Sequence, residues 1–253
     1  MSDIYVDRLV SIVMPAYNAQ DFICSAVSSV IEQTYPDWEL IIVDDSSSDN
    51  TVEVLRRFSD SRIKVVESKV NQGPGVSRNI GISKAKGRYL AFLDSDDLWN
   101  SDKLQVQIKF MSDNQSAISH TSYLFIDEHG DKRNGSVIAS KSIELQDHLR
   151  TTEIGTSTAI IDRNIVKEPI VFSTLRARQD LKLWIYLLGL GYVSNGVKEP
   201  LVSYRVRPGS VSSNKFKMLY VTFRVYLDVN TLSLYQRLSC YFSYMLNAVS
   251  KRV

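Results

Sequence analysis

The sequence has 253 residues, of which 44% are hydrophobic and 23% charged, which excludes a disordered chain, a collagen-like fibre and a disulfide-stabilised scaffold. With 30 Lys and Arg against 28 Asp and Glu, the net charge of +2 gives no general case for nucleic-acid binding. The two cysteines, Cys24 and Cys240, fit no CxxC spacing and indicate buried thiols in a reducing compartment. The N-terminus carries Asp3 and Asp7 where a secretory signal would carry Lys or Arg, and no stretch reaches the ~18 apolar residues of a membrane span, so we expect a cytoplasmic chain.

The first hundred residues alternate between short apolar runs, typical of buried strands, and segments with helical periodicity. We expect strands at 10–14, 38–43, 62–67 and 89–93, and helices at 19–34, 51–58 and 75–86. Strands and helices that alternate in this way predict a parallel sheet with right-handed crossovers. Ligands on such sheets bind beyond the carboxyl ends of the strands, and the polar clusters of this sequence fall there.

After Asn114 the pattern changes. Strands are expected at 117–126, 136–139, 155–161 and 202–206, and a helix at 180–190. No repeat or low-complexity segment separates the two halves. The second half is therefore expected to extend the first sheet as a mixed sheet within one domain, residues 1–213, followed by a helical tail over residues 214–253.

Three carboxylates within four residues follow the fourth predicted strand: Asp94, Asp96 and Asp97. Burying such close carboxylates unpaired would be expensive, and a bound Mg²⁺ or Mn²⁺ would remove the repulsion. The alternative is that Ser95 or Asp96 caps the helix that follows Trp99, a role for which one carboxylate suffices. The cluster therefore favours a metal site over a helix cap.

Three other polar segments also lie at the ends of predicted strands. Asp44 and Asp45 can accept hydrogen bonds from a base or a ribose, or they can form an ordinary Asx-rich turn. Tyr17 can stack on a base or simply pack. The Gly73–Gly75 junction and Arg78 can bind phosphate, although the third glycine of a dinucleotide fingerprint and any Walker lysine motif are missing.

These segments occur in the order and spacing of family 2 inverting glycosyltransferases with the GT-A fold, which the sequence resembles. The motifs that carry the resemblance are residues 10–18, 43–51, 71–81 and 93–97. The resemblance is dense over residues 10 to about 115 and thinner to about 213, and it is closest to small bacterial enzymes that assemble surface polysaccharides. It implies a Rossmann-like, mostly parallel sheet flanked by helices, with 1–115 as the nucleotide-sugar-binding half and 116–213 as the acceptor half.

The resemblance further implies a nucleotide-diphosphate-sugar donor, most often a UDP-sugar, bound with Mn²⁺ or Mg²⁺. Tyr17 would then stack on the uracil, Asp45 would hydrogen-bond the base, and Arg78 would lie near the base or the diphosphate. Asp96 and Asp97 would bind the ribose and the metal. The whole set of expected donor-site residues is Pro15, Tyr17, Asp44, Asp45, Arg78, Asp94, Ser95, Asp96, Arg205 and Arg207.

The catalytic base of this family lies in a Glu-Asp pair before an aromatic-rich helix, and Gln179-Asp180 matches that pair. Asp180 is therefore the expected base, and Gln179 departs from the family's Glu. Without the resemblance, Asp180 would read as a carboxylate that the helix dipole favours. Arg207 stands where the family's closing Tyr-Arg-x-His segment has its His, which favours contact with phosphate over metal ligation.

The acceptor side is the least determined part of the resemblance. Thr156 and Ser157 resemble the acceptor-side strand, and Trp184 lies in the aromatic-rich helix that would follow the base. Together these residues predict an inverting transfer in which Asp180 takes the acceptor's proton and an α-linked donor gives a β-linkage. We expect glucose from UDP-glucose and a polyprenyl-diphosphate-linked saccharide acceptor, as in O-antigen assembly.

Two alternatives remain open from the sequence. A metal-dependent sugar nucleotidyltransferase would need a Gly-rich, lysine-containing segment near the N-terminus, which residues 16–21 do not supply. A non-catalytic module that binds sugar nucleotides or glycans would keep the donor site without the base.

The tail, residues 214–253, combines positive charge with apolar periodicity. It contains six Lys and Arg against the single Asp228. Its apolar residues recur at helical spacing: Phe216, Tyr220, Phe223, Leu227, Thr231, Leu234, Leu238, Tyr241, Met245 and Val249. This pattern predicts peripheral attachment to the cytoplasmic face of the inner membrane, and the alternative is that the stripe packs on the catalytic domain.

Overall fold

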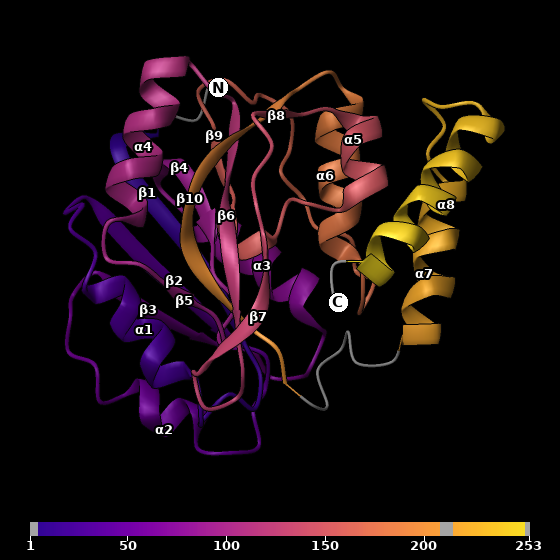
Figure 1. Ribbon diagram of the computed structural model, residues 1–253. Helices are drawn as coiled ribbons and strands as arrows, with labels where there is room; N and C mark the ends of the chain where they lie inside the picture. Colours follow the sequence, from indigo (N-terminus) through magenta and orange to yellow (C-terminus); the bar gives the residue numbers. More distant parts are fainter. Residues whose placement is uncertain (1–4, 208–214, 251–253) are drawn as a thin grey trace.

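The computed structural model describes residues 5–207 and 215–250, in which a central sheet carries helices on both faces (Figure 1). Within these residues ten strands form one sheet in the order β3-β2-β1-β4-β9-β6-β10-β5, while β7 pairs with β6 and β8 with β10. Strands from both halves of the chain therefore belong to the same sheet, as the change of pattern after Asn114 predicts.

The first half forms the parallel part of this sheet. Its strands are β1 (Val6–Ala16), β2 (Trp38–Asp44), β3 (Ile63–Glu67) and β4 (Gly87–Phe92). All neighbouring pairs among them are parallel. The register sets Ala16 beside Asp44 and Asp44 beside Glu67, so the polar segments after these strands meet at one edge.

The helices of the first half are α1 (Ile23–Ile31), α2 (Thr51–Leu55), α3 (Pro74–Lys84) and α4 (Lys103–Asn114). The helix predicted at 19–34 is shorter at both ends. At its start, the backbone N–H groups of Ala19 and Gln20 donate to the side chains of Thr51 and Asp49, at 2.8 and 3.1 Å. These bonds hold the chain against the loop after β2 before the helix begins.

The second half makes the sheet mixed. Its strands are β5 (Leu98–Trp99), β6 (Ile118–Ile126), β7 (Lys132–Val137), β8 (Ser142–Ile143), β9 (Ile160–Asp162) and β10 (Ser194–Arg205). β9 lies antiparallel between β4 and β6, and β10 is parallel to β6. The strand predicted at 155–161 is replaced by a 3₁₀ turn, Thr156–Thr158, followed by the short β9. β10 begins at Ser194, well before the predicted residue 202. The prediction missed its first part because the register shifts around Pro200 disrupt the periodicity.

Each face of the sheet carries its own hydrophobic core. Ile12 and Met14 of β1 belong to one cluster with α1, α2 and α4, whereas Val13 belongs to a second cluster. The second cluster includes α5 (Leu145–Thr151) and α6 (Gln179–Gly189). This alternation of side chains along β1 explains why both faces of the sheet need a covering layer.

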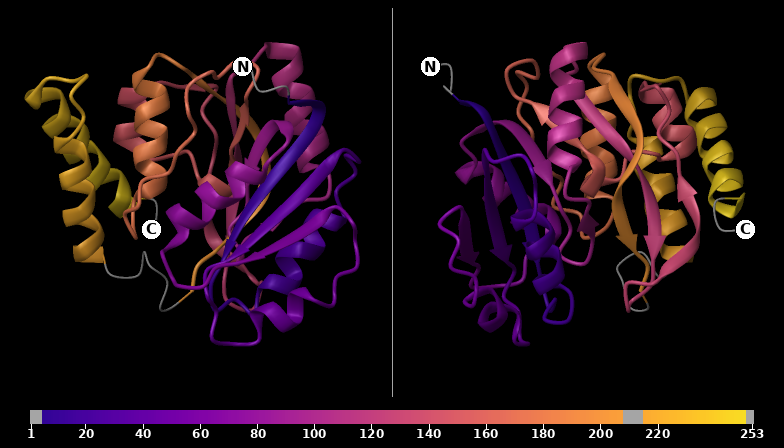
Figure 2. Two further views of the ribbon diagram at one scale, coloured as in Figure 1. Left: turned by 180° about the vertical axis from the view of Figure 1, so that it is seen from behind. Right: turned by 60° about the vertical axis from the view of Figure 1, so that its left-hand side comes forward.

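The C-terminal residues form two helices, α7 (Lys215–Leu227) and α8 (Leu234–Ser250), which stand outside α5 and α6 (Figures 1 and 2). The single stripe predicted for the tail is interrupted between them. Among residues 218–247, the buried side chains are Met218, Thr222, Val225, Tyr226, Val229, Cys240 and Tyr244. Packing on the domain therefore accounts for one face of the tail. Tyr220 and Leu234 of the predicted stripe remain about three-fifths exposed, at 61% and 59%, and the side chains of Phe216 and Val249 lie outside the described part.

The structure bears on the expected buried thiols and on the expected lack of a membrane span. Cys240 is buried, but Cys24 is exposed on α1, so the expectation of two buried thiols is wrong for Cys24. Within residues 5–207 and 215–250, no helix has both the length and the hydropathy that crossing a membrane requires.

Candidate active site

The expected donor-site residues gather at the carboxyl edge of the parallel strands, where β1, β2 and β4 end. The loop after β2 is organised by its own carboxylates. Asp45 is 2% exposed, and its two oxygens accept the backbone N–H groups of Gln72 and Gly73 at 2.9 and 2.7 Å. Asp44 accepts the Ser47 hydroxyl at 2.5 Å, so the Asx-turn interpretation holds for this residue. The expected contact of Asp45 with a base stays a prediction.

The loop that Asp45 holds leads to Gly73 and Gly75, and each position requires glycine for a different reason. Gly73 has a φ of 92°, in the left-handed region. At Gly75 a Cβ would lie 2.2 Å from the carbonyl oxygen of Ser173, so only glycine lets the two segments approach. The segment before α6 is thereby held against the start of α3. Tyr17, which follows β1 and is 48% exposed, has a ring that is free to stack on a ligand.

Arg78 lies one turn into α3 and is 3% exposed. It donates from Nη2 to Asp94 Oδ1, and its guanidinium carbon lies 5.1 Å from the ring centroid of Phe172. Its Nε and Nη1 are buried and find no hydrogen-bond partner in the described parts of the chain. Buried donors are normally paired, so these two nitrogens indicate a site for an acceptor-rich ligand such as a diphosphate.

The acidic loop, residues 94–97 after β4, is hydrogen-bonded to the second half of the chain. The backbone N–H of Asp94 donates to Ser157 Oγ at 3.1 Å, and Ser157 Oγ donates to Asp97 Oδ2 at 2.6 Å. The other oxygen of Asp97 accepts the backbone N–H of Arg205 at 2.9 Å. Asp97 is 1% exposed, and burial, with the neighbouring charges of Asp96 and Asp94, raises its pKa well above the ordinary value.

Asp94 and Asp96 face the solvent more than Asp97 does, with side chains 33% and 21% exposed. Burial, although opposed by Arg78, raises the pKa of Asp94, and the charges of Asp96 and Asp180 raise it further. Asp96 also bonds to Arg207 Nε at 2.8 Å. Crowded carboxylates of this kind are relieved by a cation.

A metal held by the protein alone does not fit, because the described residues contain no group of three or more His, Cys, Asp or Glu side chains that could hold one. Mg²⁺ is usually held by one or two carboxylates together with substrate phosphates, and Asp94 and Asp96 fit that arrangement. Asp97 differs from the expected metal ligand, because both of its oxygens are bonded within the protein. The alternative of a helix cap at Ser95 or Asp96 is wrong, because α4 has Asp102 at its N-cap.

Asp180 lies in the first turn of α6. Its Oδ1 accepts the backbone N–H of Leu181 at 2.8 Å, and its Oδ2 accepts the Thr156 hydroxyl at 3.3 Å. The next residue, Ser157, holds Asp97. Thr156 therefore lies beside the expected base, whereas Ser157 contacts the acidic loop. The expected acceptor contact of Trp184 is not supported, because this side chain is 1% exposed and packs edge-on against Phe92 in the core.

The two closing arginines contact the acidic loop differently, because Arg207 donates to the Asp96 carboxylate and the Arg205 guanidinium donates to backbone oxygens. Arg205 donates to the backbone carbonyl oxygens of Asp96, Asp127 and Glu128 at 2.7, 2.8 and 3.1 Å, so its guanidinium holds the protein together. The remainder of the closing segment, from residue 208 to 212, lies outside the described residues.

Sequence reasoning missed Phe172, which supports the guanidinium of Arg78. Asn79 exchanges two hydrogen bonds with the backbone of Phe172, at 2.9 and 2.8 Å. Asn79 lies in the third motif, so its amide side chain one residue after Arg78 was the available signal. An amide there can pair with a backbone segment, but its partner lies 93 residues away in the sequence.

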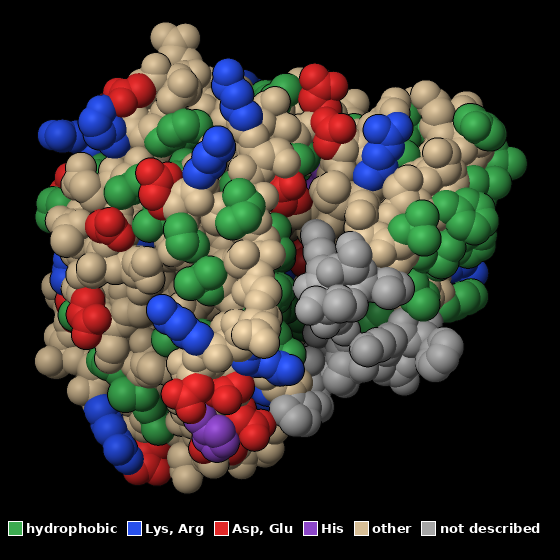
Figure 3. Space-filling model, in the orientation of Figure 1, with side chains coloured by type: hydrophobic (Ala, Val, Ile, Leu, Met, Phe, Trp, Pro, Cys, Tyr) green, Lys and Arg blue, Asp and Glu red, His purple; other side chains and the backbone are tan. Residues whose placement is uncertain are grey.

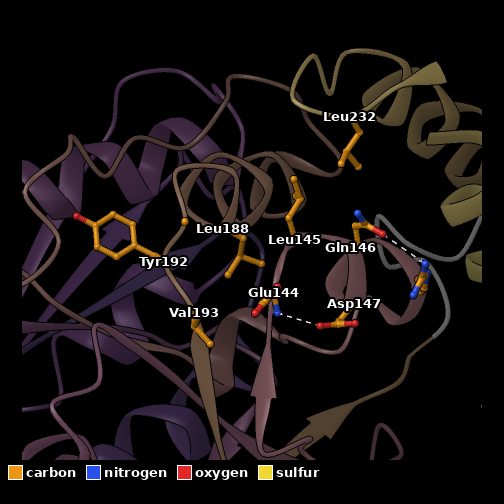
Figure 4. Close-up of a pocket in the computed structure, with 10 residues that line it drawn as sticks. Glu144, Leu145, Gln146, Asp147, Leu188, Tyr192, Val193 and Leu232 are labelled. Atoms are coloured by element: carbon orange, nitrogen blue, oxygen red, sulfur yellow. Dashed lines mark hydrogen bonds between the residues drawn. The ribbon is translucent and has the colours of Figure 1, made fainter. Parts of the chain in front are cut away.

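A separate hollow of about 500 Å³ opens between α5, the end of α6 and the segment before α8 (Figure 4). Its lining includes Leu145, Leu188 and Leu232. Its acidic residues form the capping box of α5, in which Glu144 N–H donates to the Asp147 carboxylate at 3.2 Å and the Glu144 carboxylate accepts Asp147 N–H. None of the expected site residues lines it, and we assign it no ligand.

Comparison with known proteins gives consistent results. The sequence model described as "Glycosyl transferase family 2" matches residues 11–168. The chain is 41% identical over 247 residues to a protein of Bacillus subtilis (strain 168) named "Putative teichuronic acid biosynthesis glycosyltransferase TuaG", covering 97% of this chain and 98% of the relative. It is 39% identical over 214 residues to the Escherichia coli "UDP-Glc:alpha-D-GlcNAc-diphosphoundecaprenol beta-1,3-glucosyltransferase WfgD", covering 84% and 83%.

Among solved structures, the fold is similar to S. aureus TarS 1–349 in complex with UDP-GlcNAc. The TM-score is 0.73 at 20% sequence identity, and the match covers 95% of this chain and 72% of TarS 1–349. At this level of identity the likeness concerns the fold, and it agrees with the mixed sheet and flanking helices described above.

Proposed function

This chain belongs to glycosyl transferase family 2 and has the GT-A fold, and from that premise we propose that it transfers glucose from UDP-glucose, with inversion, to a lipid-diphosphate-linked sugar. The donor and acceptor in this proposal are supported by the printed activity of the relative WfgD. The observation that carries it in this chain is the pair Thr156 and Ser157: consecutive hydroxyls contact Asp180 and Asp97 and so join the proposed base to the acidic loop.

The donor side of the site rests on Arg78, Tyr17 and the acidic loop. Tyr17, half exposed at the end of β1, stacks on the uracil. The two unpartnered nitrogens of Arg78 bind the diphosphate, together with Arg207 once it leaves Asp96. Asp94 and Asp96 would hold Mn²⁺ or Mg²⁺, and such an ion would supply positive charge to offset the charge of the departing UDP.

The acceptor side rests on Asp180. Its carboxylate is oriented by Thr156 and by the first turn of α6, so it can take the proton of the acceptor hydroxyl as that oxygen attacks the anomeric carbon. The attack comes from the face opposite the leaving diphosphate, and the bond to UDP breaks as the new glycosidic bond forms. One base and one displacement give inversion, so an α-linked donor yields a β-linkage.

We also propose that the protein reaches its acceptor at the membrane surface through α8. The exposed hydrophobic side chains of this helix recur along one side: Leu234, Tyr235, Phe242 and Leu246, at 59, 82, 61 and 74% exposure. Figure 3 shows hydrophobic side chains gathered on the outer surface of the C-terminal helices. A lipid-linked acceptor stays in the bilayer, and an exposed apolar helix face suits its surface.

The transfer itself is tested with the full chain, a panel of nucleotide sugars, Mn²⁺ and a synthetic GlcNAc-diphosphate-lipid, with products read by mass spectrometry. We expect addition of one hexose from UDP-glucose. Asp180→Asn should lower turnover by about 10²- to 10⁴-fold and keep donor binding, while the exposed Asp37→Asn serves as the matched control. Transfer only to a soluble sugar would overturn the lipid-linked acceptor.

Two other outcomes separate the alternatives. Donor binding without transfer to any acceptor would favour a non-catalytic module, and unchanged turnover of Asp180→Asn would overturn the assignment of the base.

For membrane attachment, Phe242→Glu with Leu246→Glu should reduce sedimentation with anionic liposomes relative to the wild type and to the exposed α6 variant Tyr186→Phe. Equal sedimentation of all three would contradict the attachment.

A further inference from the structure

The helix that carries Asp180 starts without a side-chain cap. Arg178 occupies the N-cap position of α6 with φ 64° and ψ 17°, a left-handed conformation that is uncommon for a residue other than glycine. No side chain at that position bonds to the free N–H groups of the first turn. The backbone just before Gln179 and Asp180 therefore needs support from elsewhere.

That support comes from the C-terminal tail. Nη2 of Arg178 donates to the hydroxyl of Tyr244 on α8 at 2.6 Å, and the guanidinium carbon lies 5.7 Å from the ring centroid of the same tyrosine. Tyr244 is 7% exposed, so water does not compete freely for this contact. One side chain of α8 thus fixes the residue that lies two positions before the proposed base.

The tail is also fixed to α6 by packing. Val225, Tyr226 and Val229 share a hydrophobic cluster with Leu181 and Leu187 of α6. Two residues after Asp180, Lys182 pairs with Asp228 at 3.4 Å, although both side chains are well exposed. The ring centroid of Tyr244 lies 6.0 Å from that of Tyr226, so the same packing holds Tyr244 and α8 offers Arg178 a fixed partner.

We propose that Tyr244 is a positioning residue for the transfer reaction: by holding Arg178 in its left-handed conformation, it sets where α6 begins and hence where the Asp180 carboxylate points. This rests on the proposed role of Asp180 as the base. Small displacements of a reacting group lower rates strongly, so the contact should affect turnover. It should leave donor binding unchanged, since the hydrogen bond and ring contacts of Tyr244 are with Arg178, Tyr226 and Tyr241.

The test is Tyr244→Phe in the full chain, with Tyr186→Phe, a half-exposed tyrosine on α6, as the matched control. We expect kcat to fall about tenfold in Tyr244→Phe. The KM for the UDP-sugar, its dissociation constant by calorimetry and the unfolding midpoint should stay near the wild-type values. A purely structural role would instead lower the unfolding midpoint or raise the KM for the donor, and either result without a loss of kcat would overturn the proposal.

A second variant removes the other partner. Arg178→Gly keeps the left-handed backbone accessible but loses the side chain, and it should match Tyr244→Phe in kcat. The double variant should be no slower than the slower single variant, because both changes break the same contact. Additive losses would contradict the proposal. If Tyr244→Phe folds poorly, Arg178→Gly still tests the contact by itself, and a wild-type kcat in Arg178→Gly would overturn the proposal.

Asp180→Asn measured in parallel separates the two levels of failure. If Asp180→Asn is inactive and Tyr244→Phe turns over like the wild type, the positioning role is wrong and the proposed function stands. If Asp180→Asn keeps full turnover, the base is misassigned and the positioning role falls with it.

Discussion

Two buried carboxylates at opposite edges of the parallel sheet, Glu39 and Asp97, have pKa values shifted in opposite directions. At the amino edge, Glu39 is 6% exposed and accepts hydrogen bonds from Lys64 Nζ, the backbone N–H of Lys86 and the Ser11 hydroxyl at 2.7, 2.8 and 2.8 Å. Burial raises the pKa of Glu39, but these bonds outweigh burial and hold it below the ordinary value. At the carboxyl edge, burial and the neighbouring Asp96 and Asp94 raise the pKa of Asp97.

The difference separates stability from function. A carboxylate with a lowered pKa stabilises the folded chain at neutral pH, whereas one with a raised pKa costs free energy while it stays charged. The amino edge therefore contributes to folding. The carboxyl edge keeps unfavourable charge at Asp97, which is consistent with the donor site proposed there.

The variant with the largest expected effect is Asp96→Asn, at the carboxyl edge. We expect turnover to fall by at least about a hundredfold, since losses of 10–100-fold follow even from changes to residues that only support metal ligands. The free energy of unfolding should not fall, because a repelling charge is removed. Steady-state kinetics and urea unfolding measure the two quantities, with the exposed Asp113→Asn as control, and a folding defect that explains the lost turnover would contradict it.

Arg78→Lys should weaken binding of the donor by about 10- to 100-fold, because Lys cannot reproduce the two guanidinium nitrogens that are left for the diphosphate. Calorimetry with UDP in the presence of Mn²⁺ measures this effect. Arg57→Lys, on the exposed surface near α2, is the control. Unchanged affinity for UDP would mean that Arg78 serves only to neutralise Asp94.

At the amino edge, Glu39→Gln should lower the free energy of unfolding by about 1–3 kcal/mol at pH 7 and leave kcat unchanged. Because the pKa of Glu39 is lowered, its stabilisation is present above the ordinary value of 4.5 and is lost as the pH falls through the lowered pKa. The gap between wild type and variant should therefore close on acidification. Urea titrations between pH 3 and 7 check this, and a gap that widens in acid would contradict it.

The smallest expected effect has the opposite sign. Asp97→Asn should raise the free energy of unfolding at pH 7 by about 1 kcal/mol, because an amide accepts from Arg205 N–H and donates to Ser157 without a buried charge. Urea unfolding of the variant and the wild type at pH 7 measures it. A destabilised Asp97→Asn would show that the charge itself is needed for the fold.

The parallel strands and their polar ends could be predicted because each signal is local. Continuous β-branched runs such as 10–14 mark buried strands, and the polar segments follow them directly. What each carboxylate binds could not be predicted, because the partners are distant: Asp45 bonds to Gln72 and Gly73, and Asp97 bonds to Ser157.

The tail shows the same limit. Its helical periodicity was visible in the sequence, but which side is buried depends on α5 and α6. Tyr226, which lies outside the predicted stripe, is 1% exposed and donates its hydroxyl to the Leu149 carbonyl oxygen. The exposed side of α8 is the part of the prediction that still bears on membrane contact.

The bonds that complete the acidic loop also set an order in time. Asp97 is bonded by Ser157 and by the backbone of Arg205, the latter 108 residues further along the chain. At translation rates of roughly 5–20 residues per second, the ribosome takes on the order of 5–20 s to deliver Arg205 after Asp97. The acidic loop of a nascent chain that has only its parallel strands is therefore incomplete, because the bond from Arg205 to Asp97 forms only when β10 joins the sheet.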